Sequence, residues 1–420
     1  MTQPATAESR PSNWLPWGVA ALCGLVYLGL GQGALYGDGV GILLELHEHH
    51  ALDSRAHFLY GPIVVGLWRM MEPWGVSLYR VALAASALGT AVGVGCLLQA
   101  SRALFDGWRP AVWCAVLVAT CPSVLFYATV VEHHGVFFAF AGLALLAMVR
   151  LAVRPGVGRA VSFGISTALA ALTHATAHLL PWVGVALFPL LVRGDSPKLP
   201  LRRVLLLAAV VACTHLAVAT GTLGLLRALG LASASVGFAA ERLVQLVERD
   251  LPRLVHTPDK VLREWLWPFL PVSIGCLLAL RRRSERRLAV VLQLLVLPYA
   301  MLTAVLVYDD EFGAYILPLA WPAAVLTVRT IHGRWLPLLL VAAALVGGVR
   351  LWRHETISCT RQAARALTAE RGERDLFLLP VTTEDLELCF VGLPGVPFYY
   401  LPQLVRYPRE AVQAFLPQLD

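Results

Sequence analysis

Long apolar segments recur along most of the chain and constrain its fold more than any other feature. A helix that crosses a bilayer needs about 20 mostly apolar residues. On that criterion the sequence predicts eleven spans, at residues 14–35, 77–100, 110–127, 134–152, 160–177, 179–192, 203–226, 265–280, 288–307, 313–330 and 335–352. Residues 59–71 are also apolar, but Pro62 and Arg69 interrupt them, so we expect a re-entrant or interfacial helix there.

The composition favours a multi-pass membrane protein over a soluble one. Hydrophobic residues make up 58% of the chain and charged residues only 15%, whereas soluble domains are about one quarter charged. We attribute the net charge of +7 to basic loops that orient helices in a membrane, and we expect no nucleic-acid partner. The predicted fold class is therefore an all-α polytopic membrane protein.

The loop charges predict an orientation. With the N-terminus in the cytoplasm, every short basic cluster falls in alternate loops, among them those at residues 150–159 and 281–287. The positive-inside rule then places the C-terminus outside the cytoplasm, in what we expect to be the inner (plasma) membrane of a bacterium. Residues 37–75 and 228–264 become external loops of a transmembrane domain over residues 1–353.

The polar C-terminal segment, residues 354–420, reads as a small extracytoplasmic α/β unit. Its pattern predicts a helix over residues 360–371 and strands over 375–381 and 388–391. Two of the eight cysteines, Cys359 and Cys389, lie here. An oxidising compartment would let them form a disulfide, although Cys389 also fits a buried strand position.

The densest group of polar residues, at 36–62, follows the first predicted span. Asp38 stands between Gly37 and Gly39, which allow a tight turn and the close approach of a substrate. A partly desolvated carboxylate at a membrane boundary can act as a general base. Gly and Asp are also common residues of a simple turn that ends a helix.

The same window contains candidate metal ligands. On a helix, His47, His50 and Asp53 would share one face, because each lies three residues after the last. Imidazole and carboxylate groups suit zinc or manganese, and a divalent metal is the one cofactor that the sequence indicates. An interfacial loop whose histidines contact lipid phosphate or sugar fits these residues as well.

Other ionisable residues lie at predicted outer helix ends. Glu132, His133 and His134 open the fourth span, and ionisable groups at membrane depth are candidates for function, although ordinary interfacial polarity fits these residues as well. His174 and His178 are four residues apart, which would place them on one helical face. The acidic run at residues 309–311 exceeds what helix capping needs, and could bind a metal, a sugar or a cationic group.

Several short motifs together resemble the GT-C membrane glycosyltransferases, especially the family of protein O-mannosyltransferases and aminoarabinose transferases. Gly37-Asp38-Gly39 looks like the acidic motif of that family's first external loop. The stretch at 57–62 is similar to its His-Pro-Pro stretch, and 78–105, 122–132 and 315–319 are similar to later helices and turns. The resemblance covers roughly residues 14–330.

The resemblance implies transfer of a sugar on the extracytoplasmic face. The donor would be a polyprenyl-phosphate sugar, the acceptor a lipid, glycan or protein, and membrane lipids would surround both. Asp38 would accept the proton of the acceptor hydroxyl, or orient that hydroxyl. The residues expected to contact substrate are His57, Tyr60, Glu132, His133, Arg242, Arg249, Asp310, Glu311 and Tyr315.

Two other function classes fit a polytopic protein. A lipid or polysaccharide transporter, or flippase, should show paired repeats with helices broken at the membrane midplane, and the sequence has no internal repeat. A non-catalytic membrane scaffold would not need so many acidic and histidine residues on one face.

Overall fold

The computed structural model of the chain describes residues 14–33, 39, 42–43, 45–46, 57–191, 200–231, 251–306, 311–357, 377–379 and 398–400. The α-helices in these ranges are α1 (Leu15–Gly29), α3 (Tyr60–Met71), α4 (Leu78–Leu104), α5 (Trp108–Ala119), α6 (Pro122–Thr129), α7 (His134–Val153), α8 (Val157–Thr173), α9 (Leu180–Leu191), α10 (Leu201–Ala228), α12 (Thr257–Val261), α13 (Val272–Ala279), α14 (Arg283–Leu306), α15 (Ala320–Thr330) and α16 (Leu336–Ile357). Shorter helical turns are η1 (Glu72–Trp74), η2 (Ala175–Leu179), η3 (Leu251–His256), the π-helical η4 (Leu262–Leu266), η5 (Ala314–Leu319) and η6 (Gly333–Trp335).

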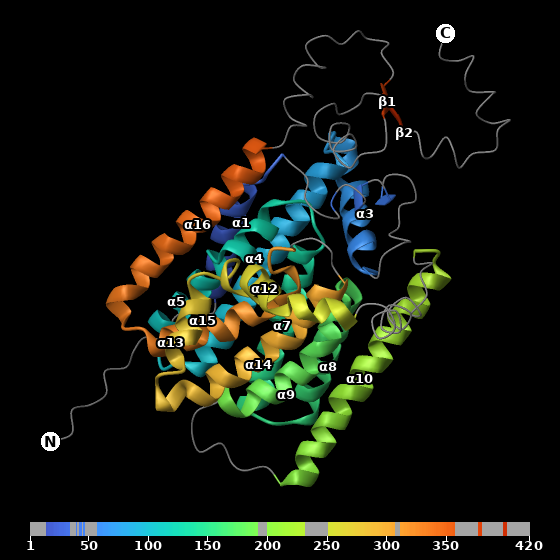
Figure 1. Cartoon of the computed structure of the whole chain (residues 1–420). Helices are drawn as coiled ribbons and strands as arrows, with labels where there is room; N and C mark the ends of the chain where they lie inside the picture. The colour runs from blue at the N-terminus through green and yellow to red at the C-terminus, as the bar shows by residue number, and fades with distance from the viewer. Residues whose placement is uncertain are drawn as a thin grey trace, which may run out of the picture.

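Helix α4 and helix α7 form the centre of the bundle. Helix α4 packs against α1, α5 and α7, while α8 packs between α7 and α10, and α13 packs against α15. Figure 1 shows α10 and α16 along opposite edges of the bundle. Because both edge helices expose most of their apolar residues, the bundle has the apolar outer surface of a protein embedded in lipid.

Most predicted spans correspond to helices, but fewer are long enough to cross a bilayer alone. Among the described residues, four helices have the length and composition of a span, or five if the bent pair α5 and α6 counts as one. Each of the eleven predicted ranges overlaps at least one described helix. The structure therefore agrees with an all-helical membrane fold, and the number eleven stays a prediction.

The predicted span over 110–127 is not a straight helix. Helix α5 ends at Ala119, α6 begins at Pro122, and the two are bent by 60°. Pro122 has no backbone N–H to continue the ladder of hydrogen bonds, so the chain turns and starts a new helix at the proline. All eight residues of α6 are buried, which places this short helix inside the bundle.

The expected helical face that joins His174 and His178 is wrong. Helix α8 ends at Thr173, and His174 adopts an extended conformation (φ −157°, ψ 124°) before the turn η2. The backbone therefore leaves the helix at His174, and the imidazole of His174 contacts the Thr176 hydroxyl. The two histidines therefore have different neighbours. Nδ1 of His178 lies 3.0 Å from Nε2 of His215.

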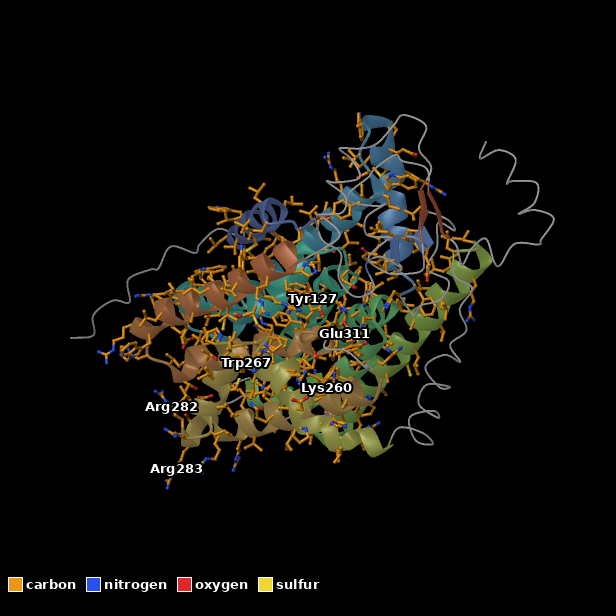
Figure 2. All side chains as sticks on the ribbon, turned by 45° about the horizontal axis from the view of Figure 1, so that its top comes forward. Tyr127, Lys260, Trp267, Arg282, Arg283 and Glu311 are labelled. Carbon is orange, nitrogen blue, oxygen red and sulfur yellow. The ribbon has the colours of Figure 1, made fainter. Side chains whose placement is uncertain are left out.

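The helix connections at one end of the bundle carry basic residues. At this end, Arg329 lies 4.0 Å from Glu285 and over the Phe105 ring, which brings together the ends of α4, α14 and α15. Figure 2 shows Arg282 and Arg283 at this edge, well away from Tyr127 and Glu311. These are the chain connections whose basic residues were predicted to face the cytoplasm.

The C-terminal segment is described only at two short strands. Strand β1 (Phe377–Leu379) pairs in parallel with β2 (Phe398–Tyr400). The predicted helix over 360–371, the second predicted strand and both tail cysteines lie outside the described residues, so the α/β unit and its disulfide stay predictions.

Candidate active site

The turn between α6 and α7 brings three ionisable residues into the bundle. Glu132, His133 and His134 are only 2–3% exposed. The Ser86 hydroxyl of α4 donates to the Glu132 carbonyl at 2.8 Å, and the Glu132 N–H lies 3.3 Å from the same hydroxyl. These contacts hold the turn against α4, so helix α7 starts deep in the protein with two histidines at its first turn.

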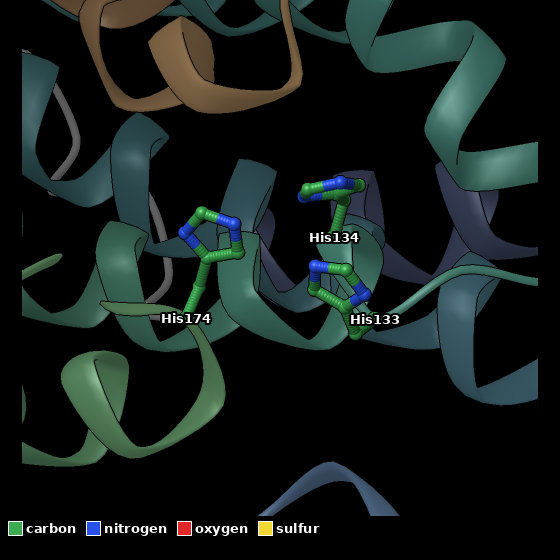
Figure 3. A group of neighbouring side chains, drawn as sticks. All are labelled: His133, His134 and His174. Carbon is green, nitrogen blue, oxygen red and sulfur yellow. The ribbon is translucent and has the colours of Figure 1, made fainter. Parts of the chain in front are cut away.

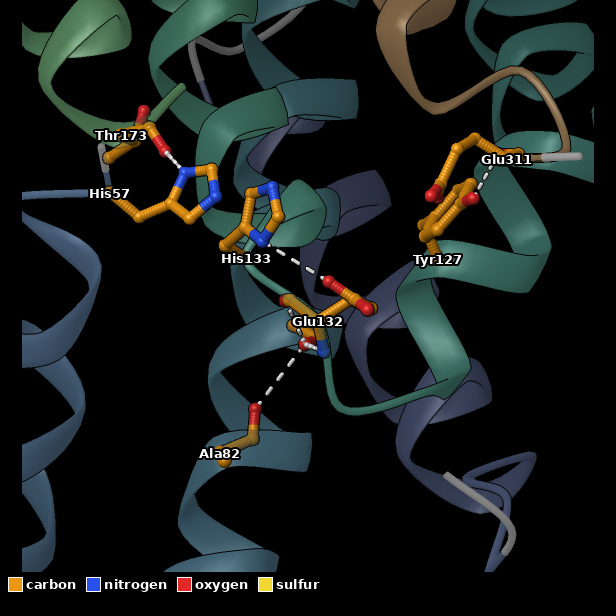
Figure 4. A network of polar contacts seen from close by, with 8 residues as sticks. His57, Ala82, Tyr127, Glu132, His133, Thr173 and Glu311 are labelled. Atoms are coloured by element: carbon orange, nitrogen blue, oxygen red, sulfur yellow. Dashed lines mark hydrogen bonds and ion pairs between the residues drawn. The ribbon is translucent and has the colours of Figure 1, made fainter. Parts of the chain in front are cut away.

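Glu132 also contacts the first of these histidines. Its carboxylate lies 3.1 Å from Nδ1 of His133, as Figure 4 shows. A carboxylate beside Nδ1 favours the proton on that nitrogen, which leaves Nε2 with a lone pair directed away from Glu132. The orientation of the His133 ring is thus set by its neighbour in the sequence.

His57 reaches the same place from the start of α3. Its Nδ1 lies 3.0 Å from the carbonyl oxygen of Thr173, to which it can only donate, and the Leu59 N–H donates to the Leu172 carbonyl at 3.0 Å. The His57 ring stacks on His133 with centroids 3.5 Å apart. The segment before α3 is therefore fastened to the end of α8, with its imidazole over the His133 ring.

His174 completes a group of four imidazoles. Its ring is nearly parallel to that of His133, with centroids 5.2 Å apart, and lies 5.1 Å from that of His134. His174 is 4% exposed. We call His57, His133, His134 and His174 the histidine cluster; Figure 3 shows the last three around a common space.

Aromatic side chains enclose the histidine cluster. Tyr315 lies 5.1 Å from His174 and 6.3 Å from His134, measured between ring centroids. Tyr127 approaches His134 at 4.6 Å, and the buried Tyr60 meets His133 edge-on. The cluster is thus bordered by phenol groups that can hydrogen-bond hydroxyl-rich molecules.

A buried carboxylate holds the segment that carries Glu311 and Tyr315. Glu264 of η4 is fully buried and accepts the backbone N–H groups of Glu311 at 2.8 Å and of Gly313 at 2.6 Å. Phe312 and Gly313 have φ values of +44° and +80°. A Cβ at residue 313 would also meet Phe269 at 2.4 Å, so glycine fits both the conformation and the space.

Further hydrogen bonds attach this segment to α6. The Ser123 hydroxyl donates to the Phe312 carbonyl at 2.8 Å, and the Tyr127 hydroxyl donates to the Glu311 carbonyl (Figure 4). Since Tyr127 also contacts His134, Glu311 is connected to the histidine cluster through one tyrosine.

The structure brings together the predicted site residues that it describes. Contacts through the histidine cluster connect His57, Tyr60, Glu132, His133 and Tyr315, and Glu311 joins them through Tyr127. The other predicted residues lie outside the described residues and stay predictions: Asp38, His47, His50, Asp53, Arg242, Arg249 and Asp310. These segments were predicted to share the outer face, and the described members do lie at one end of the bundle.

Two contributors were not foreseen from the sequence. Glu264 looks like an ordinary loop acid, and nothing in its local pattern indicates that it binds backbone groups nearly fifty residues away. His174 was noticed only as a partner of His178, because the end of α8 is not visible in an apolar sequence. A histidine that directly follows a run of apolar residues was the available signal.

An apolar cavity of about 370 Å³ lies elsewhere in the bundle. Its lining comes from the late part of α7 (Met148, Leu151), the early part of α8 (Phe163), α9 and the early part of α10. The histidine cluster lies at the other ends of α7 and α8. At about 1.5 Å per residue, the cavity lies roughly 16–21 Å along these helices from the histidine cluster, so it is not part of the candidate site.

The fold is similar to that of a solved membrane transferase. The chain superimposes on ArnT from Cupriavidus metallidurans bound to undecaprenyl phosphate with a TM-score of 0.57 and 14% identity, covering 97% of this chain and 94% of that chain. The apo structure of the same protein gives a TM-score of 0.57 and 16% identity, and the match covers 91% of this chain and 84% of that chain. No protein-family model and no curated protein sequence matches the chain. The likeness shows that this integral membrane protein has a GT-C-like fold, as the sequence resemblance implied.

Proposed function

We propose that the protein is a membrane glycosyltransferase that moves a sugar from a polyprenyl-phosphate donor to an acceptor on the extracytoplasmic face. The observation that carries the proposal is the contact group of His57, Glu132, His133 and Tyr315 at one end of a GT-C-like bundle, in which Glu132 and His133 are buried. Ionisable side chains at such depth are costly without a function. The solved structure of similar fold was determined with undecaprenyl phosphate, which supports a lipid of that class as donor carrier.

Asp38 is our candidate for the base. The described residues on both sides of its loop are fixed beside the cluster. Before it, Gln32 donates its N–H to the Thr129 carbonyl at 2.8 Å. After it, Ile42 and Leu43 are fully buried in a core with Tyr60, next to Val131. A carboxylate in this loop would take the proton of an acceptor hydroxyl as the hydroxyl oxygen attacks the anomeric carbon of the sugar.

The departing polyprenyl phosphate carries negative charge that must be stabilised as the bond to the sugar breaks. Arg242 and Arg249, in the external loop 228–264, are the cations that we assign to this role. Glu132, His133, His57 and Tyr60 would then line the acceptor side. Tyr315 with the acidic residues Asp310 and Glu311 would contact sugar hydroxyl groups.

The orientation that we propose puts this end of the bundle outside the cytoplasm, in a bacterial inner membrane. Eleven spans with a cytoplasmic N-terminus place the loops 37–75 and 228–264 and the segment 354–420 on that side. The separation of Arg282 and Arg283 from Tyr127 and Glu311 supports this arrangement (Figure 2). Lipid-linked sugars are then within lateral reach of the site.

A transporter remains the second class to test. Its binding site should lie near the membrane midplane between broken helices. The histidine cluster instead lies at the first turn of α7 and at the end of α8, which favours chemistry at one membrane face.

The proposal is tested by mass spectrometry of lipid-linked sugars and surface glycans in a strain that lacks this chain. We expect one lipid-linked sugar to accumulate and one sugar modification to disappear, with both restored by the wild-type chain. Loss of a flippase would instead leave the lipid-linked sugar on the inner leaflet, so the leaflet in which the lipid accumulates distinguishes the two classes.

A further inference from the structure

We propose that His133, His134 and His174 bind one divalent transition-metal ion of the zinc class; the site rests on described residues alone, and only its role rests on the proposed function. One ring nitrogen of each histidine lies within 4.8 Å of those of the other two. All three side chains are at least 96% buried. This site differs from the one predicted at His47, His50 and Asp53.

The separation of the nitrogens suits a metal after a small movement. Zinc bound by histidines at about 2.0–2.1 Å in a tetrahedron needs nitrogens about 3.3–3.4 Å apart. The rings can approach by the remaining distance through rotation about their side-chain bonds, because they come from two separate chain segments. His133 and His134 open α7, while His174 lies in the extended connection after α8.

The groups beside two of the three rings, His133 and His174, match those that orient metal ligands. Histidines that bind metals donate their other ring N–H to a carboxylate, a carbonyl or a similar acceptor. Nδ1 of His133 lies 3.1 Å from Glu132, and Nδ1 of His174 lies 2.6 Å from the Thr176 hydroxyl. Each contact presents Nε2 to the ion once the proton is on Nδ1. The Thr176 N–H, 3.3 Å from the same Nδ1 of His174, would then give up its longer contact.

His134 supplies an independent indication of a ligand. Its Nδ1 is buried and has no hydrogen-bond partner among the residues that the structure describes. A buried polar nitrogen without a partner costs roughly 1–3 kcal/mol. Coordination of an ion by the His134 ring would offset that cost, whereas an apolar core could have avoided it with a different residue.

The charge of such a site fits the proposed reaction. Among the described residues, the carboxylate of Glu132 contacts one of these histidines, His133. A divalent ion with one carboxylate leaves a net positive charge in a poorly solvated place, which would attract a phosphate group. Three protein ligands also leave a fourth position open, as in catalytic rather than structural zinc sites.

The experiment uses the full chain purified in detergent with an affinity tag free of histidine. After treatment with a chelator, the protein is titrated with Zn²⁺ by calorimetry and with Co²⁺ by visible absorption. We expect one ion per chain and an absorption spectrum of four- or five-coordinate Co²⁺ with nitrogen ligands. Wild-type protein of normal elution profile that binds neither ion would overturn the proposal.

Variants locate the ion. His134→Gln and His174→Gln should each weaken Zn²⁺ binding by about a hundredfold or more, and Glu132→Gln by about 10–100-fold, the usual effect of a residue that orients a ligand. His332→Gln, at an exposed position in the connection before η6, is the matched control and should bind like wild type. Equal affinity in all four variants would place the ion elsewhere and refute the site.

A second measurement covers variants that fold poorly. Zn²⁺ should raise the Tm of wild type and His332→Gln, because a ligand that binds only the folded state stabilises it. His134→Gln and His174→Gln should show no such rise in Tm with Zn²⁺. Sugar transfer is measured separately. A protein that binds the ion at these histidines but transfers no sugar would support the metal site and contradict the proposed function.

Discussion

Glu264 stabilises the turn at residues 311–313 through hydrogen bonds to its backbone. A fully buried carboxylate that accepts two backbone N–H groups stabilises the turn at residues 311–313 only while it is present. Glu264→Ala leaves the buried Gly313 N–H without this acceptor, at a cost of roughly 1–3 kcal/mol, and removes the acceptor of the partly buried Glu311 N–H as well. We expect a clear fall in Tm in detergent, measured by intrinsic fluorescence.

Glu72→Ala is the control for this change, since Glu72 is exposed in η1, and should leave the Tm unchanged. Glu264→Gln, which keeps one acceptor oxygen, should fall between wild type and Glu264→Ala. A Glu264→Ala protein as stable as wild type would show that the turn is held by other contacts.

Asp38 carries the sharpest prediction about chemistry. Asp38→Asn keeps the shape of the side chain and removes the base, so turnover should fall by about a hundredfold or more. Expression and lipid binding should stay close to normal. Asp53→Asn, further along the same loop, should cost far less, and the comparison of the two rates in membranes checks the assignment. Full activity in Asp38→Asn would move the base to Glu132 or Asp310.

At the scale of elements, α4 and α7 approach closely because glycines line their contact. A Cβ at Gly142 would meet the Gly93 carbonyl oxygen at 2.8 Å, and one at Gly135 would meet that of Ser86 at 2.3 Å. Small residues let helices pack tightly in lipid, where apolar burial gives little drive for association. The turn at residues 132–134 is positioned by this contact.

Gly142→Ala should therefore separate the two helices and destabilise the protein by about 1–3 kcal/mol, the usual cost of overpacking. Gly224→Ala in α10 is the matched control, because a Cβ there meets nothing within 4 Å and alanine favours a helix. Thermal unfolding of both in the same detergent compares them. An unchanged Tm for Gly142→Ala would mean that the helices can move apart at no cost.

The sequence predicted where apolar helices lie much better than where they break. Hydropathy located α4, α7 and α10 within a few residues, because lipid requires long apolar helices. The bend at Pro122 and the end of α8 at Thr173 depend on contacts between helices, which hydropathy does not report. The same limit applies to the candidate site. Glu132 and His133 could be predicted because they are ionisable residues in an apolar chain, whereas Glu264 could not, because its hydrogen bonds go to backbone groups far away in the sequence.

At the scale of the whole molecule, the connection that contains Arg282 and Arg283 lies well away from Tyr127 and Glu311. The basic connection at residues 281–287 should face the cytoplasm. A single cysteine placed at position 283 in a cysteine-free chain should react with a membrane-impermeant reagent only after the cells are opened. Labelling of that cysteine in intact cells would invert the orientation and place the histidine cluster on the wrong side for the proposed donor.

The central claim is that this bundle transfers a sugar from a polyprenyl-phosphate donor. The most direct measurement adds purified protein to membranes of the deletion strain, which should contain the accumulated donor, and follows donor and free polyprenyl phosphate by mass spectrometry. We predict that the donor falls and polyprenyl phosphate rises by equal molar amounts with wild type, and about a hundredfold more slowly with Asp38→Asn. A folded wild-type protein that leaves both lipids unchanged in those membranes would contradict the account.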